Sequence, residues 1–246
     1  MTAPLALIDN LEYLPNPFTQ FEQHHQQSVL SIPLLENIDY KRDYQLALCF
    51  IYSYNGSKAT FNSYRREVER LLLWSWYVKS SPSTHLRRDE IEEFIHFCMA
   101  PPEDWIGTKN VARFSNKMGV RVSNPQWRPY VAHISKLDFR GGDVPLTKNY
   151  ALSQAAIRAT FSILSSYYCF LMQEEASQQD PVALIRQKSK FVKKEVTRRQ
   201  VRRISNLQWD YVIETAEILA DEDPLMHERT LFIMNALLGM YLRISE

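Results

Sequence analysis

The chain has 246 residues, of which 45% are hydrophobic, and a formal net charge of +1. This length and composition are sufficient for a packed core. Only 6 glycines are present and no glycine-rich phosphate-binding pattern occurs, so a nucleotide-binding α/β enzyme is not expected. The longest apolar stretch, 231–242, contains Asn235 and is too short to span a bilayer, and no positively charged region precedes the first apolar residues. We therefore expect a cytoplasmic protein without a membrane partner.

The side chains that ligate metals or act as nucleophiles show no recognisable spacing. The 6 histidines form no HxxxH or HExxH pattern, and no GxSxG motif occurs. Cys49, Cys98 and Cys169 lie far apart in apolar segments, which is typical of reduced thiols in a core. We expect no metal and no small-molecule cofactor.

The first third of the chain predicts an extended arm followed by helices. Residues 1–38 mix prolines, glutamines and aromatic residues without periodicity, which indicates an arm with at most short helical pieces. A helix is predicted over 39–54, where apolar residues recur every three or four positions, and Asn55-Gly56 ends it.

The next two predicted helices form an antiparallel hairpin. One begins near Ser57 or Thr60 and ends at 80–83, and the other covers 88–99. Apolar residues mark one face of the first of these helices. The opposite, outward face is expected to carry Arg65, Arg66, Glu69 and Arg70.

Residues 101–148 differ in composition from their surroundings and read as a long insertion. Five prolines and several aromatic residues alternate with Lys and Arg, and the pattern around 120–134 suggests a β-hairpin. Further helices are predicted from Ser153 to about Glu175, over 181–186, from Asn206 to Leu219, and from Pro224 to about Gly239. The predicted fold is therefore mainly α.

Positive charge is concentrated in one short segment. Between Arg186 and Arg203, nine residues are Lys or Arg and one, Glu195, is acidic. Such a segment is either a solvated linker or a surface for DNA phosphates, and the charge density favours DNA. The candidate DNA-binding residues are Lys188, Lys190, Lys193, Lys194, Arg198 and Arg199 in this run, with Arg65, Arg66, Arg70, Lys79 and Arg158 on the helices as weaker candidates.

The last ten residues, LLGMYLRISE, resemble the first arginine box of the tyrosine recombinases, the phage-integrase family. That box is usually close to LLYxTGLRISE, so Met240-Tyr241 replaces its Thr-Gly. Other segments resemble parts of the family in the expected order. The stretch 60–64 through 73–76 resembles the opening helix of the core-binding domain. The stretch 157–172 resembles a later helix of that domain, and Asp180-Pro181 after it is a variant of the usual Asn-Pro. The stretch 206–209 resembles the start of the catalytic domain.

The resemblance implies a site-specific recombinase or integrase that cleaves and rejoins DNA through a 3′-phosphotyrosine link, without metal or ATP. Arg243 would be its first catalytic arginine, because a guanidinium can donate two parallel hydrogen bonds to a phosphodiester. Glu246, one helical turn later, would support that arginine. Judged alone, Arg243 is more simply explained as a surface arginine at a helix end, stabilised by the helix dipole; the ordered resemblance favours the catalytic role.

The resemblance also implies a domain organisation and partners. An N-terminal arm and helix (1–56) precede a SAM-like core-binding domain (57–187) with the insertion at about 101–148. A basic linker (188–205) and the first helices of a mixed α/β catalytic domain (206–246) follow. The partners would be double-stranded DNA and other recombinase protomers in a synaptic complex, in association with the nucleoid.

The nucleophilic tyrosine of the family has no counterpart among the tyrosines of this sequence. We therefore expect residues 1–246 alone to be inactive in cleavage and a longer product to be the enzyme. One alternative is a non-catalytic DNA-binding protein, such as a truncated integrase or an architectural factor. Another is an all-helical protein-interaction module whose basic run is incidental.

Overall fold

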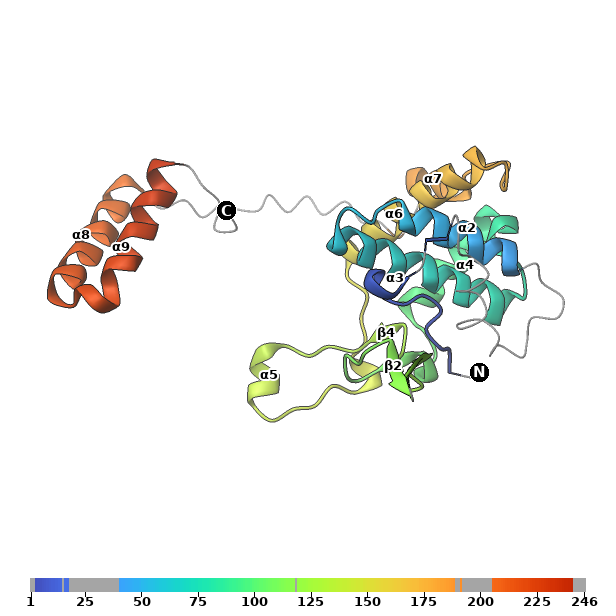
Figure 1. Ribbon diagram of the computed structural model, residues 1–246, viewed down its shortest axis with the longest axis horizontal. Helices are drawn as coiled ribbons and strands as arrows, with labels where there is room; N and C mark the ends of the chain where they lie inside the picture. The colour runs from blue at the N-terminus through green and yellow to red at the C-terminus, as the bar shows by residue number, and fades with distance from the viewer. Residues whose placement is uncertain are drawn as a thin grey trace. The chain divides into compact units, whose positions relative to one another are not determined.

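The computed structural model describes residues 3–14, 16–17, 40–117, 119–188, 191 and 205–240, with backbone alone at 184, 186–188 and 238. The fold is mainly α, with 62% helix and 6% strand. The chain forms two compact units, Met1–Lys194 and Glu195–Glu246. Figure 1 labels the α-helices of both units.

Five helices form the body of the first unit. They are α2 (Tyr40–Tyr52), α3 (Lys58–Trp74), α4 (Arg88–Met99), α6 (Gln154–Gln173) and α7 (Pro181–Lys188). Helix α6 packs against α2, α3 and α7, and α4 packs against α7. The helices predicted over 39–54, 88–99, 153–175 and 181–186 are thus confirmed within one or two residues at most boundaries.

Local signals explain where these helices begin and end. The side chain of Ser57 accepts a hydrogen bond from the backbone N–H of Thr60, and Ser153 does the same for Ala156 in α6. Helix α3 continues as a π-helical turn, Ser75–Lys79, and stops at Ser80, whose φ of 50° is left-handed.

Helix α6 lies at the centre of the core. Eight of its residues are buried, including Phe161, Tyr167 and Tyr168. Among the described residues, α6 is the one helix whose length and apolar composition would allow it to cross a membrane. A packed core helix meets the same criteria, and the burial of α6 inside this unit agrees with that role.

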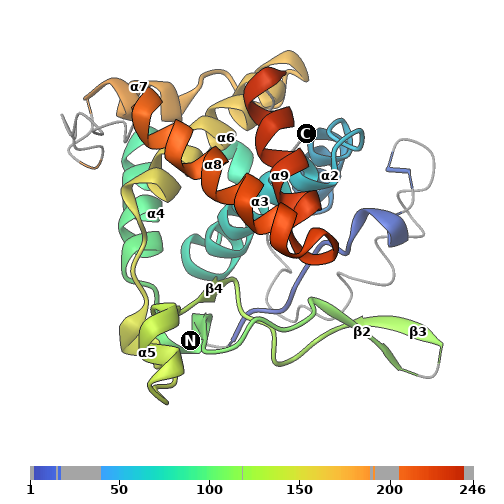
Figure 2. The same cartoon turned by 90° about the vertical axis from the view of Figure 1, so that its left-hand side faces the viewer.

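The insertion is built on the body by two small pairs of strands. Strands β1 (Ile106–Gly107) and β4 (Tyr130–Val131) are parallel, whereas β2 (Phe114–Lys117) and β3 (Val120–Ser123) form an antiparallel hairpin. The hairpin therefore lies at 114–123, and the predicted position around 120–134 is wrong. Figure 2 shows this hairpin and the short helix α5 (Lys136–Arg140) on opposite sides of the insertion.

The insertion contributes to the core of the first unit. Trp105 and Tyr130 are fully buried, and Phe114 and Trp127 are nearly so. Phe97 of α4 packs edge to face on both Trp105 and Tyr130, with ring centroids 5.0 and 6.3 Å apart. Residues 101–133 are therefore an integral part of the folded unit.

The N-terminal segment is extended, with one 3-10 turn at Leu11–Tyr13, as the sequence predicts. It does not stand away from the body, however, because Ala6, Leu7 and Ile8 are at most 1% exposed and belong to the core. The expectation that all three cysteines are core thiols is also corrected. Cys98 is buried and Cys49 half-buried, but Cys169 is exposed.

The second unit contains α8 (Asn206–Glu222) and α9 (Pro224–Gly239), which pack on each other. Both predicted helices are confirmed, and the side chain of Ser205 caps α8 by accepting a hydrogen bond from the backbone N–H of Gln208. Within the described part of this unit, only Ala216 and Ala220 are buried. Large apolar side chains are exposed on both helices, for example Tyr211, Leu225 and Phe232.

The burial of the N-terminal segment predicts that Ile8→Ala will destabilise the first unit. Removing a fully buried Ile side chain should lower the free energy of unfolding by about 2–5 kcal/mol. Urea unfolding followed by tryptophan fluorescence measures this, because four of the five tryptophans lie in this unit. Leu137→Ala is the control, since Leu137 is 79% exposed and its truncation should have little effect. Equal stability of the Ile8→Ala and Leu137→Ala proteins would contradict the burial of this segment.

Candidate nucleic-acid interface

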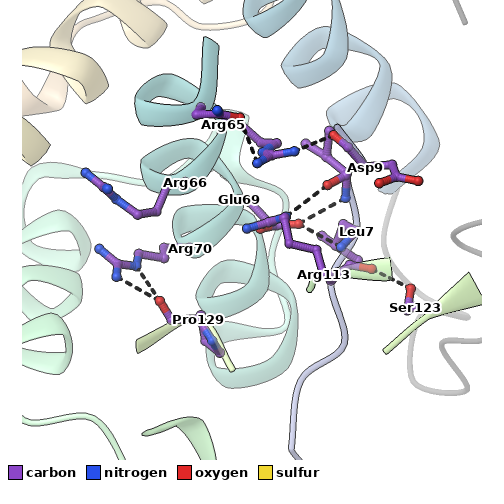
Figure 3. A network of polar contacts seen from close by, with 12 residues as sticks. Leu7, Asp9, Arg65, Arg66, Glu69, Arg70, Arg113, Ser123 and Pro129 are labelled. Carbon is purple, nitrogen blue, oxygen red and sulfur yellow. Dashed lines mark hydrogen bonds and ion pairs between the residues drawn. The ribbon is translucent and has the colours of Figure 1, made fainter. Parts of the chain in front are cut away.

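The charged residues of α3 lie on different sides of the helix. Arg65 and Glu69, which are four residues apart, face the N-terminal segment, whereas Arg66 and Arg70 project from the other side (Figure 3). Arg65 is 6% exposed and Glu69 is 1% exposed. The expectation that both lie on the outward face is therefore wrong.

Glu69 binds two segments that are remote in sequence. One carboxylate oxygen, Oε1, accepts hydrogen bonds from the backbone N–H groups of Leu7 and Ile8, at 2.7 and 3.0 Å. The other oxygen pairs with the guanidinium of Arg113, which also donates to the carbonyl of Ile8 at 3.2 Å. A buried carboxylate requires such partners, and here they connect α3, the N-terminal segment and the insertion.

Arg65 and Asp9 form the adjoining part of the same network. Arg65 Nη1 donates to the carbonyl oxygen of Asp9 at 2.6 Å and to Asn10 Oδ1 at 2.9 Å. The Asp9 carboxylate accepts from Nε and Nη2 of Arg121 in β3, at 2.9 and 2.7 Å. Burial lowers the pKa of Arg65 to about 10, although Asp9 and Glu12 oppose this effect.

Arg70 is also used to hold the insertion. Its Nε and Nη2 donate to the carbonyl oxygen of Pro129 at 2.9 and 2.7 Å, and its guanidinium lies 4.6 Å from the centre of the Tyr130 ring. Its Nη1 pairs with Glu67 at 3.3 Å, and the Arg70 side chain is only 13% exposed. Arg70 therefore does not lie on a free outward face, which corrects the sequence prediction.

The buried carboxylate of Glu67 is surrounded by donors. Arg66 Nε lies 2.7 Å from Glu67 Oε1, and the Thr160 hydroxyl donates to Oε2 at 3.0 Å. Burial alone would raise the pKa of Glu67, but Arg70 and Arg66 outweigh it and lower this pKa below its ordinary value of 4.5. Glu67 therefore remains charged in the folded protein at neutral pH.

Three predicted DNA-binding residues remain accessible. The side chain of Arg66 is 51% exposed, and Arg158 is exposed on α6. Lys79 is about one quarter exposed and pairs with Glu93 at 2.9 Å and, more distantly, with Glu90. Neighbouring carboxylates thus reduce the positive field of Lys79. Among the described residues, Arg66 pairs with Glu67 alone, which it shares with Arg70.

The remaining candidate residues lie outside the described part of the chain. This applies to Arg243 and Glu246 of the arginine box and, in the basic run, to Lys190, Lys193, Lys194, Arg198 and Arg199. Lys188 ends α7, and its side chain is not described. The assignment of these residues stays a prediction.

Arg113, Arg121, Asp9 and Glu69 are structural residues that sequence reasoning did not pair. Their partners are remote in sequence: Asp9 is 56 residues from Arg65 and 112 residues from Arg121. No local spacing rule detects such pairs. The one available signal was the presence of Glu69 beside three arginines, and this signal indicated a solvated face.

Among the described residues, no group of three or more His, Cys, Asp or Glu side chains is placed to hold a metal ion. Comparison of the chain with protein-family models, with curated proteins and with solved structures finds no match.

The lowered pKa of Glu67 predicts how stability depends on pH. A carboxylate whose pKa is lower in the folded state stabilises the fold above its ordinary pKa, and this contribution is lost as the pH falls. Glu67→Gln should therefore cost most at pH 7, about 3–5 kcal/mol, because it leaves Arg70 buried without its carboxylate. The cost should shrink as the pH falls through 4.5 and below.

Urea unfolding of both proteins between pH 3 and pH 7 measures this difference. Glu92→Gln is the matched control, because Glu92 pairs with Arg88 on the exposed surface of α4 and should contribute little at any pH. A cost for Glu67→Gln that is independent of pH would show that the Glu67 charge does not stabilise the fold.

Proposed function

We propose that this chain is the DNA-binding part of a tyrosine recombinase, with the first catalytic arginine at Arg243. The observation that carries the proposal is the position of the basic run 186–203 relative to the two units. The boundary between Lys194 and Glu195 falls within this run, and the arginine-box resemblance follows in the second unit. A cationic segment that joins two units can follow the phosphate backbone while both units contact one duplex.

In this proposal the helical body of the first unit is a SAM-like core-binding domain, and 206–246 begins a mixed α/β catalytic domain. The basic run and Arg66 supply sequence-independent contacts to phosphates, which position the protein on DNA. Other protomers would assemble on the same DNA into a synaptic complex, in the cytoplasm and in association with the nucleoid.

Arg243 would act on the phosphodiester that is cleaved. Its planar guanidinium donates two hydrogen bonds to the non-bridging oxygens and stabilises the charge of the pentacoordinate transition state, while Glu246 orients it. A tyrosine oxygen, which the family resemblance places beyond Glu246, attacks phosphorus. The 5′-hydroxyl leaves with a proton, and a 3′-phosphotyrosine bond conserves the phosphodiester energy for rejoining.

The second candidate function is a non-catalytic role in DNA binding. The composition of the second unit supports this alternative. Residues 205–240 contain seven acidic residues and one arginine, and large apolar side chains are exposed on both helices. Such a surface suits contact with protein better than contact with phosphate. An architectural factor would combine this protein-binding surface with the basic run.

The first prediction of this proposal concerns salt dependence. The full chain should bind duplex DNA with an affinity that falls steeply with salt, because bound cations release counterions. Replacing Lys190, Lys193, Lys194, Arg198 and Arg199 by alanine should flatten the slope of log affinity against log salt by up to about 0.9 for each lost phosphate contact. Fluorescence anisotropy with a labelled duplex measures the slope.

A matched control removes five cations that lie away from the basic run, by replacing Lys41, Arg42, Lys58, Arg87 and Arg88 with alanine. This control changes the net charge by the same amount as the basic-run variant. Its slope of log affinity against log salt should remain close to that of the unmodified chain, because these five residues lie outside the proposed phosphate contacts. An unchanged slope in the basic-run variant would remove this run from the interface. Absence of salt-dependent binding in the unmodified chain would favour the protein-interaction module.

The second prediction concerns cleavage. Residues 1–246 should form no covalent adduct with a nicked suicide substrate, whereas a longer product that contains the nucleophilic tyrosine should form one. In that longer product, Arg243→Lys keeps the charge but loses the two-pronged donor, so the rate of adduct formation should fall by about a hundredfold or more. DNA affinity should change little.

Adduct formation is measured by gel electrophoresis under denaturing conditions. An adduct formed by residues 1–246 would show that the nucleophile has been misassigned. Full activity of the Arg243→Lys longer product would refute the role of Arg243 as the phosphate clamp. Failure of the longer product to form any adduct, together with salt-dependent DNA binding, would favour the non-catalytic factor.

A further inference from the structure

A groove of about 600 Å³ opens between α3, the first turn of α6 and the insertion. Its walls include the side chains of Asn62 and Arg66 from α3, Asn110, Arg128 and His133 from the insertion, and the cap of α6 at Ser153. Three separate parts of the first unit thus meet around one open space. The sequence did not indicate this groove, since its walls come from three separate segments of the chain.

The groove has an excess of positive charge. Five arginines line it, whereas Glu67 is its only acidic lining residue within the described part of the chain. Glu69, behind the wall, neutralises Arg113. Glu67 and Glu69 together offset two of the five arginine charges. Three positive charges therefore remain unbalanced in this groove.

The buried member of this group, Arg113, lies in the positive field of its neighbours. Burial lowers the pKa of Arg113, and the positive charges of Arg65 and Arg66 act in the same direction, with Asp9 opposing them in part. A bound anion would relieve this repulsion. The field of the groove therefore favours a negatively charged ligand.

Two of the five arginines have donors to spare. Arg66 uses Nε for Glu67, and its two terminal nitrogens have no acceptor among the described residues. Figure 3 shows its side chain pointing away from the N-terminal segment. Arg128 uses Nη1 for the carbonyl oxygens of Pro125 and Trp127, both at 2.7 Å. These two bonds orient the guanidinium and leave its Nε and Nη2 for a ligand.

The first turn of α6 adds to this environment. Helix α6 has 20 residues, and its N-terminal end, where Ser153 caps Ala156, forms part of the groove wall. The partial positive charge at a helix N-terminus favours anions and acts here in addition to the guanidiniums. Paired guanidinium donors match the oxygens of phosphate, which accepts bidentate hydrogen bonds.

We propose that this groove binds a phosphate group, through Arg66 from α3 and Arg128 from the insertion. In the role proposed above, the phosphate belongs to the backbone of duplex DNA, and this part of the inference rests on the proposed function. The insertion thereby extends the DNA-facing surface of the helical body. A free phosphate or a small phosphorylated molecule presents the same chemistry, and the experiment separates these two sources.

The experiment uses the full chain and the double variant Arg66→Gln/Arg128→Gln. For DNA, anisotropy with a labelled duplex should show an affinity at least about tenfold weaker and a slope of log affinity against log salt flatter by about 0.9. For free phosphate, thermal unfolding is compared in inorganic phosphate and in chloride at equal ionic strength. Phosphate should stabilise the unmodified chain and not the variant.

Two further variants control for charge and folding. Arg87→Gln/Arg88→Gln removes the same charge from the exposed start of α4 and should behave as the unmodified chain. Asn110→Asp adds a carboxylate at an exposed position of the groove without removing a described hydrogen bond, so it should weaken binding while the fold is retained. Circular dichroism monitors the fold in each case.

The outcomes are distinct. If the groove variants lose both DNA affinity and thermal stabilisation by inorganic phosphate, the result supports the DNA backbone as the source of the phosphate. If they lose only the stabilisation by inorganic phosphate, the result supports a small phosphorylated ligand. If neither groove variant differs from the charge control in either measurement, the inference is overturned while salt-dependent DNA binding by the basic run still stands. If the unmodified chain binds no DNA, the proposed function fails and the phosphate measurement still decides the groove.

Discussion

The first unit depends on one buried carboxylate, that of Glu69. Its two oxygens bind the backbone N–H groups of Leu7 and Ile8 and the guanidinium of Arg113, which lie 61 to 62 residues before it and 44 residues after it. Desolvating this charge is costly unless every partner is in place, so α3, the N-terminal segment and the insertion must be assembled together. The described parts of these irregular segments are therefore held to α3 by specific polar contacts.

The parts of this fold that could be predicted from the sequence are those fixed by neighbouring residues. Apolar spacing, the caps at Ser57 and Ser153, and the prolines after Met99 locate the helices of the first unit, because helix hydrogen bonds and caps join residues three or four positions apart. The predicted position of the β-hairpin, around 120–134, is wrong. An alternating pattern extends beyond the 114–123 segment and does not specify where the chain turns.

The charged residues could not be assigned in the same way. Arg65, Arg66 and Arg70 look alike on a helical projection, yet Arg65 binds the carbonyl of Asp9, Arg70 binds the carbonyl of Pro129, and Arg66 remains half exposed. Only partners remote in sequence separate an arginine that holds the fold from one that is available to a ligand. Arg128, which sequence analysis did not select, becomes a candidate because the nearby carbonyls of Pro125 and Trp127 fix its orientation and the groove brings it near Arg66.

The distribution of charge along the chain constrains any function in DNA binding. Nine cations lie between Arg186 and Arg203, and seven acidic residues with one arginine follow in 205–240. The net negative charge of 205–240 disfavours contact with phosphate, and large apolar side chains are exposed on α8 and α9. In the proposed DNA-binding role, phosphate contacts would come from the basic run, from Arg243 and from the first unit, where Glu67 and Glu69 pair with arginines that hold the fold. Arg66 and Arg128 keep guanidinium donors without an acceptor among the described residues, and a phosphate would accept from these donors.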